Sequence, residues 1–200
     1  MIRYTKKYVP SLFDERSVID GSFSWNIKSA IRFIRFIINF TQEDKNGRKE
    51  HFDIGEVVTS IGEDGKMHIL LGQNKIITLA VLFLNILNHK PSITIQGLIN
   101  GMLFKTIVNQ DRTLRKIFVF DFANKELDTE VTNLLNDNTV FSDRFKILYD
   151  TISTKWTDSM NEDELNDFFR KFYFLTDFKE LCWNTTDDCV DISPIIDFRN

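Results

Sequence analysis

The chain has 200 residues, 42% of them hydrophobic, and carries 25 Lys and Arg against 29 Asp and Glu, a net charge of −4. This length and apolar content suit one folded domain, or one domain with a helical extension. Nineteen Phe against eight Gly and three Pro argue against a disordered chain and against a turn-rich β-sandwich.

The charge is unevenly distributed along the chain. Residues 1–120 contain 17 Lys and Arg and 11 Asp and Glu, whereas residues 121–200 contain 8 and 18, so the two balances are +6 and −10. A basic first part is the part that would bind phosphate. The same asymmetry also arises when two parts of a chain are complementary and pack together, so charge alone identifies no ligand.

Cysteine usage and apolar runs indicate an intracellular, cytoplasmic protein. Cys182 and Cys189 have no second cysteine pair and no nearby His, so reduced thiols are a better interpretation than a zinc site. The N-terminus lacks the apolar stretch of a signal peptide. The longest apolar run, 76–87, contains Thr78 and Asn85 and is shorter than the roughly 20 residues that cross a bilayer, so we expect no membrane partner.

Hydrophobic periodicity and turn residues predict an α+β fold. Asp64-Gly65 suits a tight hairpin turn, and Pro91 follows the end of a strongly apolar helix. Asn161 with Glu164 forms a capping-box pattern. In chain order we expect a helical turn at 10–14, a strand at 18–21, a helix at 26–41, strands at 54–60 and 66–71, helices at 73–88 and 94–109, a strand at 116–121, and helices at 125–136, 142–156 and 161–173.

Two helices have faces that matter for the interpretation. The helix at 73–88 is almost wholly apolar, so the rest of the molecule must cover it. On the helix at 26–41, Lys28, Arg32 and Arg35 share one face, which either tracks a nucleic-acid backbone or is simply a solvated face. The residues that we expect to be buried with the apolar helix are Leu70, Ile77, Ala80, Val81 and Leu84.

The connection between the strand at 66–71 and the apolar helix is the candidate site. A strand that ends at Gly72 and enters a helix directs free backbone N–H groups at one point, where an anion can bind. Gln73 and Asn74 offer amide groups, Lys75 a cation and, about one turn on, Thr78 a hydroxyl. An ordinary strand-to-helix connection has the same pattern, and the Walker pattern is absent.

The same residues resemble a known signature. The run I-L-L-G-Q-N-K-I-I-T-L at 69–79 resembles the I-I-D-G-Q-Q-R-L-T-T-L signature of the ParB-like N-terminal domain of GmrSD-type restriction proteins. Upstream, I-G-E-V-V at 54–58 is similar to that family's F-L-G-S-I-V strand. F-S-W at 23–25 is similar to the end of its I-P-x-Y-Q-R-P-Y-x-W segment. Order and spacing agree across about residues 8–90.

The resemblance implies both an architecture and an activity. It implies a small mixed sheet of the ParB/sulfiredoxin-like type in residues 1–90, covered by helices, with residues 91–200 as a mostly helical extension packed on it. It implies nucleotide-dependent defence against foreign DNA, with a nucleoside triphosphate and Mg²⁺ at the signature. The partners that it implies are DNA and a nuclease-bearing second chain.

Several positions depart from the signature. Leu71 stands where the family has Asp, and Leu can orient neither water nor a metal ion. Lys75 replaces Arg and cannot make bidentate guanidinium contacts. Asn74 replaces Gln, while Asp20 and Gly21 stand where the family has Gln and Arg. Gly72, Gln73 and Thr78 match.

Two functional hypotheses follow. The first is a degenerate, non-hydrolysing domain of a restriction or phage-defence system that binds nucleotide, DNA or a protein partner. The second is an active nucleoside triphosphatase of a modification-dependent DNA restriction system. We assign no catalytic residue and no metal ligand, because His51, His68 and His89 are dispersed. The candidate phosphate-binding residues are Gly72, Gln73, Asn74, Lys75 and Thr78, with Asp20 and Trp25 as neighbours.

Overall fold

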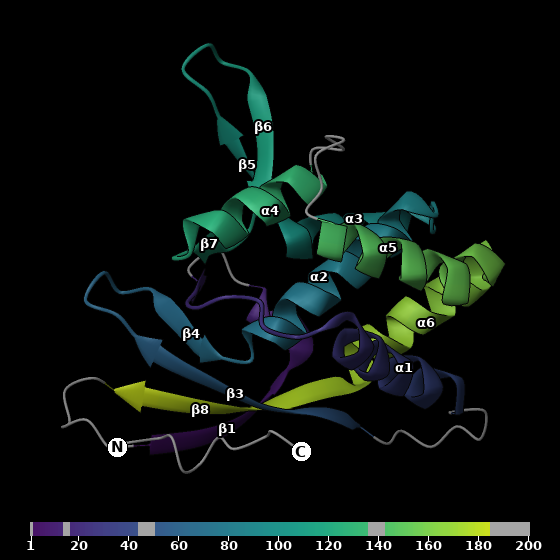
Figure 1. Ribbon diagram of the computed structural model, residues 1–200, viewed down its shortest axis with the longest axis horizontal. Helices are drawn as coiled ribbons and strands as arrows, with labels where there is room; N and C mark the ends of the chain where they lie inside the picture. The colour runs from purple at the N-terminus through teal and green to yellow at the C-terminus, as the bar shows by residue number, and fades with distance from the viewer. Residues whose placement is uncertain (1, 14–16, 44–50, 136–142, 185–200) are drawn as a thin grey trace.

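The computed structural model describes residues 2–13, 17–43, 51–135 and 143–184. They form an α+β structure in which a twisted mixed sheet lies along one side of a group of packed helices (Figure 1). The fold class expected from the periodicity is confirmed. Among the described residues, no helix combines the length and the apolar character that a membrane span requires.

The main sheet has six strands in the described part of the chain, in the order β1-β8-β3-β4-β2-β7. The β1–β8 and β3–β4 pairs are antiparallel, and the β3–β8, β2–β4 and β2–β7 pairs are parallel. The strands expected near 18, 54–60 and 66–71 are the neighbours β2, β3 and β4. The bounds are β1 (Ile2–Tyr8), β2 (Ser17–Ile19), β3 (Phe52–Ile61), β4 (Met67–Leu71), β7 (Asp121–Phe122) and β8 (Thr176–Asn184).

Strands β1 and β8 were not predicted from periodicity. In β8, Asp177 and Glu180 are only 2% and 5% exposed, so a central strand buries two carboxylates and lacks an apolar alternation. Lysines of β1 neutralise them: Lys6 pairs with Asp177, and Lys7 pairs with Glu180. Neither strand shows the apolar alternation that predicts a strand, because charged residues of each strand are paired with charged residues of the other.

The helices pack around α2, which is the centre of the core. Ile76 to Ile86 are all buried, and the ring of Phe83 lies within 5.5 Å of the rings of Phe13, Phe169 and Phe172. The predicted capping box at the start of α6 is present. The bounds are α1 (Ile27–Glu43), α2 (Gln73–Asn88), α3 (Ile93–Leu103), α4 (Lys125–Leu135), α5 (Asp143–Lys155) and α6 (Glu162–Leu175), with short 3-10 turns η1 (Val9–Leu12) and η3 (Thr157–Ser159).

One of the expected core residues is placed differently. Ile77, Ala80, Val81 and Leu84 are buried as predicted, but Leu70 is only partly buried. Successive residues of a strand point to opposite faces of the sheet, and Ile69, which is fully buried, occupies the covered face of β4. The prediction for Leu70 was wrong because this residue points to the other face of the sheet, away from the face that Ile69 occupies.

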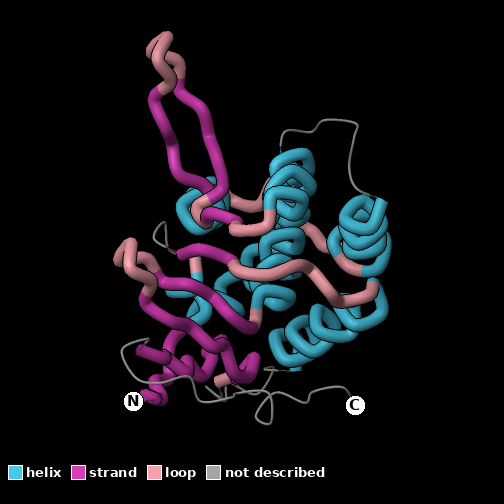
Figure 2. Tube along the Cα trace, turned by 60° about the vertical axis from the view of Figure 1, so that its left-hand side comes forward, coloured by secondary structure: helices cyan, strands magenta, loops and turns pink. Residues whose placement is uncertain are grey.

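The helix expected at 94–109 and the strand expected at 116–121 need correction. Helix α3 ends at Leu103, and the chain continues as β5 (Phe104–Val108), which pairs with β6 (Leu114–Phe118) in a separate hairpin. The N–H of Val119 donates to the carbonyl of Leu103 at 2.8 Å and ends β6, so the chain leaves one sheet and enters the other at β7. Figure 2 shows this hairpin projecting from the rest of the molecule.

Candidate functional site

The backbone at the start of α2 has the geometry expected of a strand-to-helix anion site. Gly72 has a φ of 100°, a left-handed conformation that favours glycine. Its carbonyl accepts from the N–H groups of Lys75 and Ile76 at 2.9 and 3.2 Å. A Cβ atom at Gly72 would lie 3.0 Å from the side chain of Val57. The turn therefore requires glycine, and the next two N–H groups, at the dipole end of the helix, have no partner in the described part of the chain, an arrangement that suits an anion.

Gln73 lies against the segment that precedes α1. A Cβ atom at Gly21 would be 3.4 Å from Nε2 of Gln73, and Gly21 has a φ of 85°. The structure therefore places the position where the family has Arg directly beside the signature glutamine. At that position this chain contributes only backbone, so no guanidinium reaches a phosphate from Gly21.

The side chain of Asn74 is bound to protein groups. Its Oδ1 accepts from the N–H groups of Ser24 and Trp25 at 2.8 and 3.4 Å, and its Nδ2 donates to Oγ of Ser24 at 2.9 Å. Trp25 is half-buried, with its ring 5.4 Å from that of Phe33. Asn74 thus fixes the 24–25 segment to α2, and Trp25 anchors the start of α1.

Lys75 is directed toward β3. Its Nζ donates to the carbonyl of Glu56 at 3.0 Å, and a Cβ atom at Gly55 would lie 3.1 Å from the same nitrogen. Burial lowers the pKa of Lys75, and the carboxylates of Asp53 and Glu56 oppose this effect only in part. The ammonium that was expected at a phosphate is therefore held in a bulge of β3.

Thr78 is out of reach of any ligand. The residue is 0% exposed, and its hydroxyl has no hydrogen-bond partner among the described residues. Although Thr78 matches the family signature, it lies inside the core, one turn along α2 from the free N–H groups.

Asp20 forms a short chain of polar contacts with the β3–β4 hairpin. Its Oδ2 lies 3.0 Å from Nδ1 of His68, and Nε2 of His68 lies 3.4 Å from Oδ1 of Asp64. A backbone N–H bond from Lys66, aided by His68, lowers the pKa of Asp64. Asp20 therefore ties β2 to β4, which lie side by side in the sheet.

Arg144 of α5 was not identified from the sequence. Its Nη1 donates to the carbonyl of Phe23 at 3.0 Å, its Nη2 pairs with Glu130, and its guanidinium lies 5.6 Å from the ring centre of Phe23. A cation therefore comes to the segment beside Asn74 from 121 residues away in the chain. No local spacing could have indicated this, because the contact arises only when α5 packs near α1.

A nucleoside triphosphate with Mg²⁺ fits these residues only in part. The free N–H groups of Gln73 and Asn74 suit a phosphate oxygen. Leu71, half-buried where the family has Asp, offers no oxygen to a divalent cation, and Asp20 is already bound to His68. Within the ranges that the structure describes, no group of three or more His, Cys, Asp or Glu side chains is arranged to hold a metal ion.

Comparison with known proteins adds no assignment. No protein-family model matches the chain, and a search of curated proteins found no match. The geometry therefore stands alone: the turn at Gly72 leaves two backbone N–H groups without a partner among the described residues, and the side chains of Asn74, Lys75 and Thr78 are used or enclosed within the fold.

Proposed function

We propose that this chain is a degenerate, non-hydrolysing ParB-like domain of a restriction or phage-defence system, which acts by binding. One observation carries the proposal: the side chains of three signature positions have internal partners or are inaccessible. Asn74 holds Ser24 and Trp25, Lys75 holds β3, and Thr78 is enclosed in the core. What remains for a ligand is backbone N–H and the partly exposed amide of Gln73, which can bind a phosphate but supply no nucleophile.

The missing groups are those that hydrolysis needs. Phosphoryl transfer requires an oriented nucleophile and several charges around the transferred group, usually including Mg²⁺. Leu71 and Gly21 supply neither a carboxylate nor a cation. Removing one electrostatic contact of this kind typically lowers the rate on the order of 10²–10³-fold, so two losses leave little activity.

The test is phosphate release from ATP and GTP by the purified chain with Mg²⁺, beside the double variant Leu71→Asp with Lys75→Arg. We expect negligible turnover from the unmodified chain and a gain in the double variant. Leu70→Asp with Lys75→Arg is the matched control, because Leu70 and Leu71 point to opposite faces of β4. Steady turnover by the unmodified chain that Leu71→Asp slows would support the active-hydrolase alternative.

We further propose that the partner bound by this domain is DNA, through the β5–β6 hairpin. The hairpin segment 104–118 contains four Lys and Arg and one Asp, a balance of +3, which leaves −7 on the other 185 residues. A basic two-stranded ribbon fits a groove of duplex DNA, and its cations neutralise phosphates. The hairpin projects from the body (Figure 1), so a duplex could reach it from several sides.

The tip of the hairpin also supports this proposal. Val108 and Leu114 face each other across the strands and are 68% and 74% exposed, an unusual pair to leave in water. Asp111 and Thr113 order the turn, since Oδ1 of Asp111 accepts from the N–H and the hydroxyl of Thr113. Apolar side chains on a basic arm are typical of elements that insert between base pairs in the minor groove.

The measurement is fluorescence anisotropy of a labelled duplex across a series of salt concentrations. For Arg112→Ala with Lys116→Ala, we expect weaker binding and a slope of log affinity against log salt that is smaller by about 2. Lys28→Ala with Arg32→Ala removes the same charge from the exposed face of α1 and should leave the slope unchanged. If both double variants lose the same affinity for DNA, the attraction is non-specific. If only the α1 double variant loses affinity, DNA binds at that helix.

A further inference from the structure

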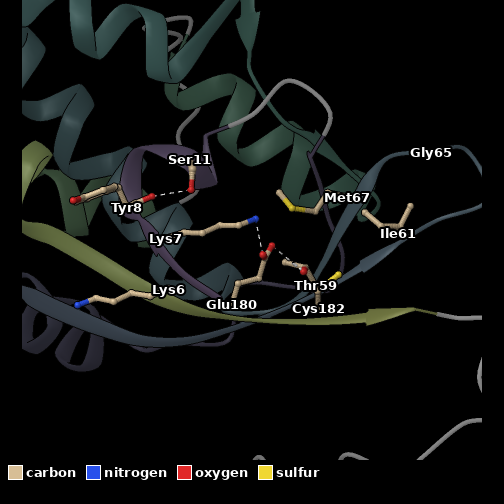
Figure 3. A pocket seen from close by; sticks show the side chains of 10 residues that line it. All are labelled: Lys6, Lys7, Tyr8, Ser11, Thr59, Ile61, Gly65, Met67, Glu180 and Cys182. Carbon is tan, nitrogen blue, oxygen red and sulfur yellow. Dashed lines mark hydrogen bonds and ion pairs between the residues drawn. The ribbon is translucent and has the colours of Figure 1, made fainter. Parts of the chain in front are cut away.

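A cavity of about 560 Å³ lies at the opposite end of β4 from Gly72. Strands β1, β3, β4 and β8 and the turn η1 surround it, and Figure 3 shows the side chains that line it. Met67, at the start of β4, is in its wall, whereas Leu71, at the end of β4, adjoins the candidate phosphate site. The cavity is therefore separate from the site described above. Its lining residues that matter here are Lys7, Thr59, Ile61, Met67, Glu180 and Cys182.

A buried ion pair forms the polar part of this cavity. Oε2 of Glu180 lies 2.5 Å from Nζ of Lys7, and Oε1 accepts from the hydroxyl of Thr59 at 3.1 Å. Glu180 is 5% exposed and Thr59 is 0% exposed. Figure 3 shows the ends of Lys7 and Glu180 meeting among the lining residues, with Thr59 beside them. The carboxylate is thus withdrawn from bulk water yet borders an open volume.

The ion pair has unused hydrogen-bonding capacity. A carboxylate has about four acceptor sites and an ammonium has three donors, whereas the described contacts use two sites of Glu180 and one donor of Lys7. A ligand there meets an acceptor and a donor side by side. The other charged residue of the lining, Lys6, is paired with Asp177 at 2.8 Å. Because the charges cancel within each pair, a neutral ligand with an N–H donor next to a C=O acceptor matches the Lys7–Glu180 pair better than an anion or a cation does.

Apolar side chains form the wall on the side of the β3–β4 hairpin. Ile61 and Met67 face the cavity from the β3–β4 hairpin, and methionine sulfur makes favourable contacts with aromatic rings. An apolar cleft with a few convergent polar groups is the usual form of a small-molecule site. We propose that this cavity binds a small neutral molecule that carries a carboxamide or a ring lactam on an apolar, planar body.

Cys182 supplies a direct reporter of occupancy. It lies two residues beyond Glu180 in β8, lines the same cavity and is partly exposed. In a Cys189→Ser chain it is the one remaining thiol of the sequence. A bound ligand should therefore slow alkylation of Cys182 by iodoacetamide in proportion to the fraction of sites that it fills.

The experiment compares three probes of nearly equal shape on the Cys189→Ser chain: benzamide, benzoate and benzylamine. We expect benzamide to slow alkylation of Cys182 saturably, reaching about tenfold at nine times its Kd by mass action. Benzoate, repelled by Glu180, and benzylamine, repelled by Lys7, should not do so at the same concentration. No protection by benzamide, or equal protection by all three probes, would overturn the proposal.

Variants then connect protection to the ion pair. Glu180→Gln keeps the shape but removes the carboxylate, and it should abolish protection by benzamide. Asp177→Asn is the matched control, because it removes the other buried carboxylate of β8, which does not line the cavity. Ile61→Trp narrows the cavity from a position that is 44% exposed, so it should also abolish protection even where Glu180→Gln fails to fold. Protection that survives Ile61→Trp would place benzamide elsewhere.

Discussion

At the scale of single residues, the signature positions contribute to structure. Asn74 and Lys75 stand where the resembled family has Gln and Arg, and each is the right length for a protein partner. The shorter amide of Asn74 reaches Ser24, and the single ammonium of Lys75 reaches one carbonyl of β3. At both positions the side chain therefore joins α2 to its neighbours.

Replacing Asn74 by Ala should lower the free energy of unfolding by about 1–2 kcal/mol, because the N–H groups of Ser24 and Trp25 lose their acceptor. Urea denaturation with an unchanged m-value measures this. Asn88→Ala removes a single exposed bond, to the hydroxyl of Tyr149, and should cost less than about 0.5 kcal/mol. Equal effects of the two changes would show that Asn74 has no special structural role.

Lys75 should make stability depend on pH in the alkaline range. Burial lowers its pKa below the ordinary 10.5, so the folded protein binds this proton less tightly than the unfolded chain does. The charged form therefore destabilises the fold at neutral pH, and the penalty decreases as pH rises from the lowered pKa toward 10.5. Unfolding curves measured at several pH values should show that the free energy of unfolding of the wild type increases, relative to that of Lys75→Met, as the pH rises. A difference that is constant with pH would contradict this.

At the scale of elements, helix α2 depends on the turn that begins it. The turn brings β4 and α2 together only because Gly72 adopts a left-handed conformation and lies close to Val57. The same geometry leaves the first N–H groups of α2 without a partner among the described residues. The stability of the turn and the exposure of these N–H groups therefore have a common cause, and both are sensitive to a side chain at position 72.

Replacing Gly72 by Ala should destabilise the protein by about 2 kcal/mol or more, from the left-handed backbone together with the contact to Val57. Gly97→Ala is the control. Gly97 is inside α3, and an added Cβ would have no atom of the described residues within 4 Å beyond its chain neighbours and the helix backbone around it. This variant of the protein should be more stable by about 0.5–1 kcal/mol. Thermal unfolding of both variants decides the question. If Gly72→Ala is as stable as the wild type, the turn can accommodate a side chain at this position.

At the scale of the whole molecule, β8 closes the sheet. Strands β1 and β3 do not pair with each other, since each pairs with β8 on one of its sides. The sheet that begins in residues 1–90 is thus completed by residues at 176–184, after all the described helices. The contacts of Asp177 and Glu180 with lysines of β1 strengthen the same closure.

The fragment 1–90 should therefore fail to fold by itself, although the family resemblance covers that segment. Without β8, strand β1 has no neighbour and β3 exposes an unpaired edge, which favours aggregation. Circular dichroism and amide exchange of the fragment and of the full chain test this. A fragment with protected amides in β3 and β4 would show that the first part is an independent domain.

Local patterns in the sequence determined much of this structure. Helix α2 has the predicted bounds 73–88, and β3, β4 and the α6 capping box lie where they were expected. Each depends on periodicity, on an Asp-Gly turn or on a cap, and these act over a few residues. The glycine at the start of α2 was also identified, because a strand that ends before an apolar helix requires a turn there.

Only the tertiary structure decided which polar groups meet. Lys7 and Glu180, Asn74 and Ser24, and Arg144 and Phe23 come from segments between 50 and 173 residues apart. Their meeting depends on the strand order and on helix packing, which no local pattern encodes. Strand β8 was not predicted from the sequence because it contains two carboxylates. Burial of such a charge is tolerated only when a distant lysine pairs with it. The separate cavity follows from that long-range pairing.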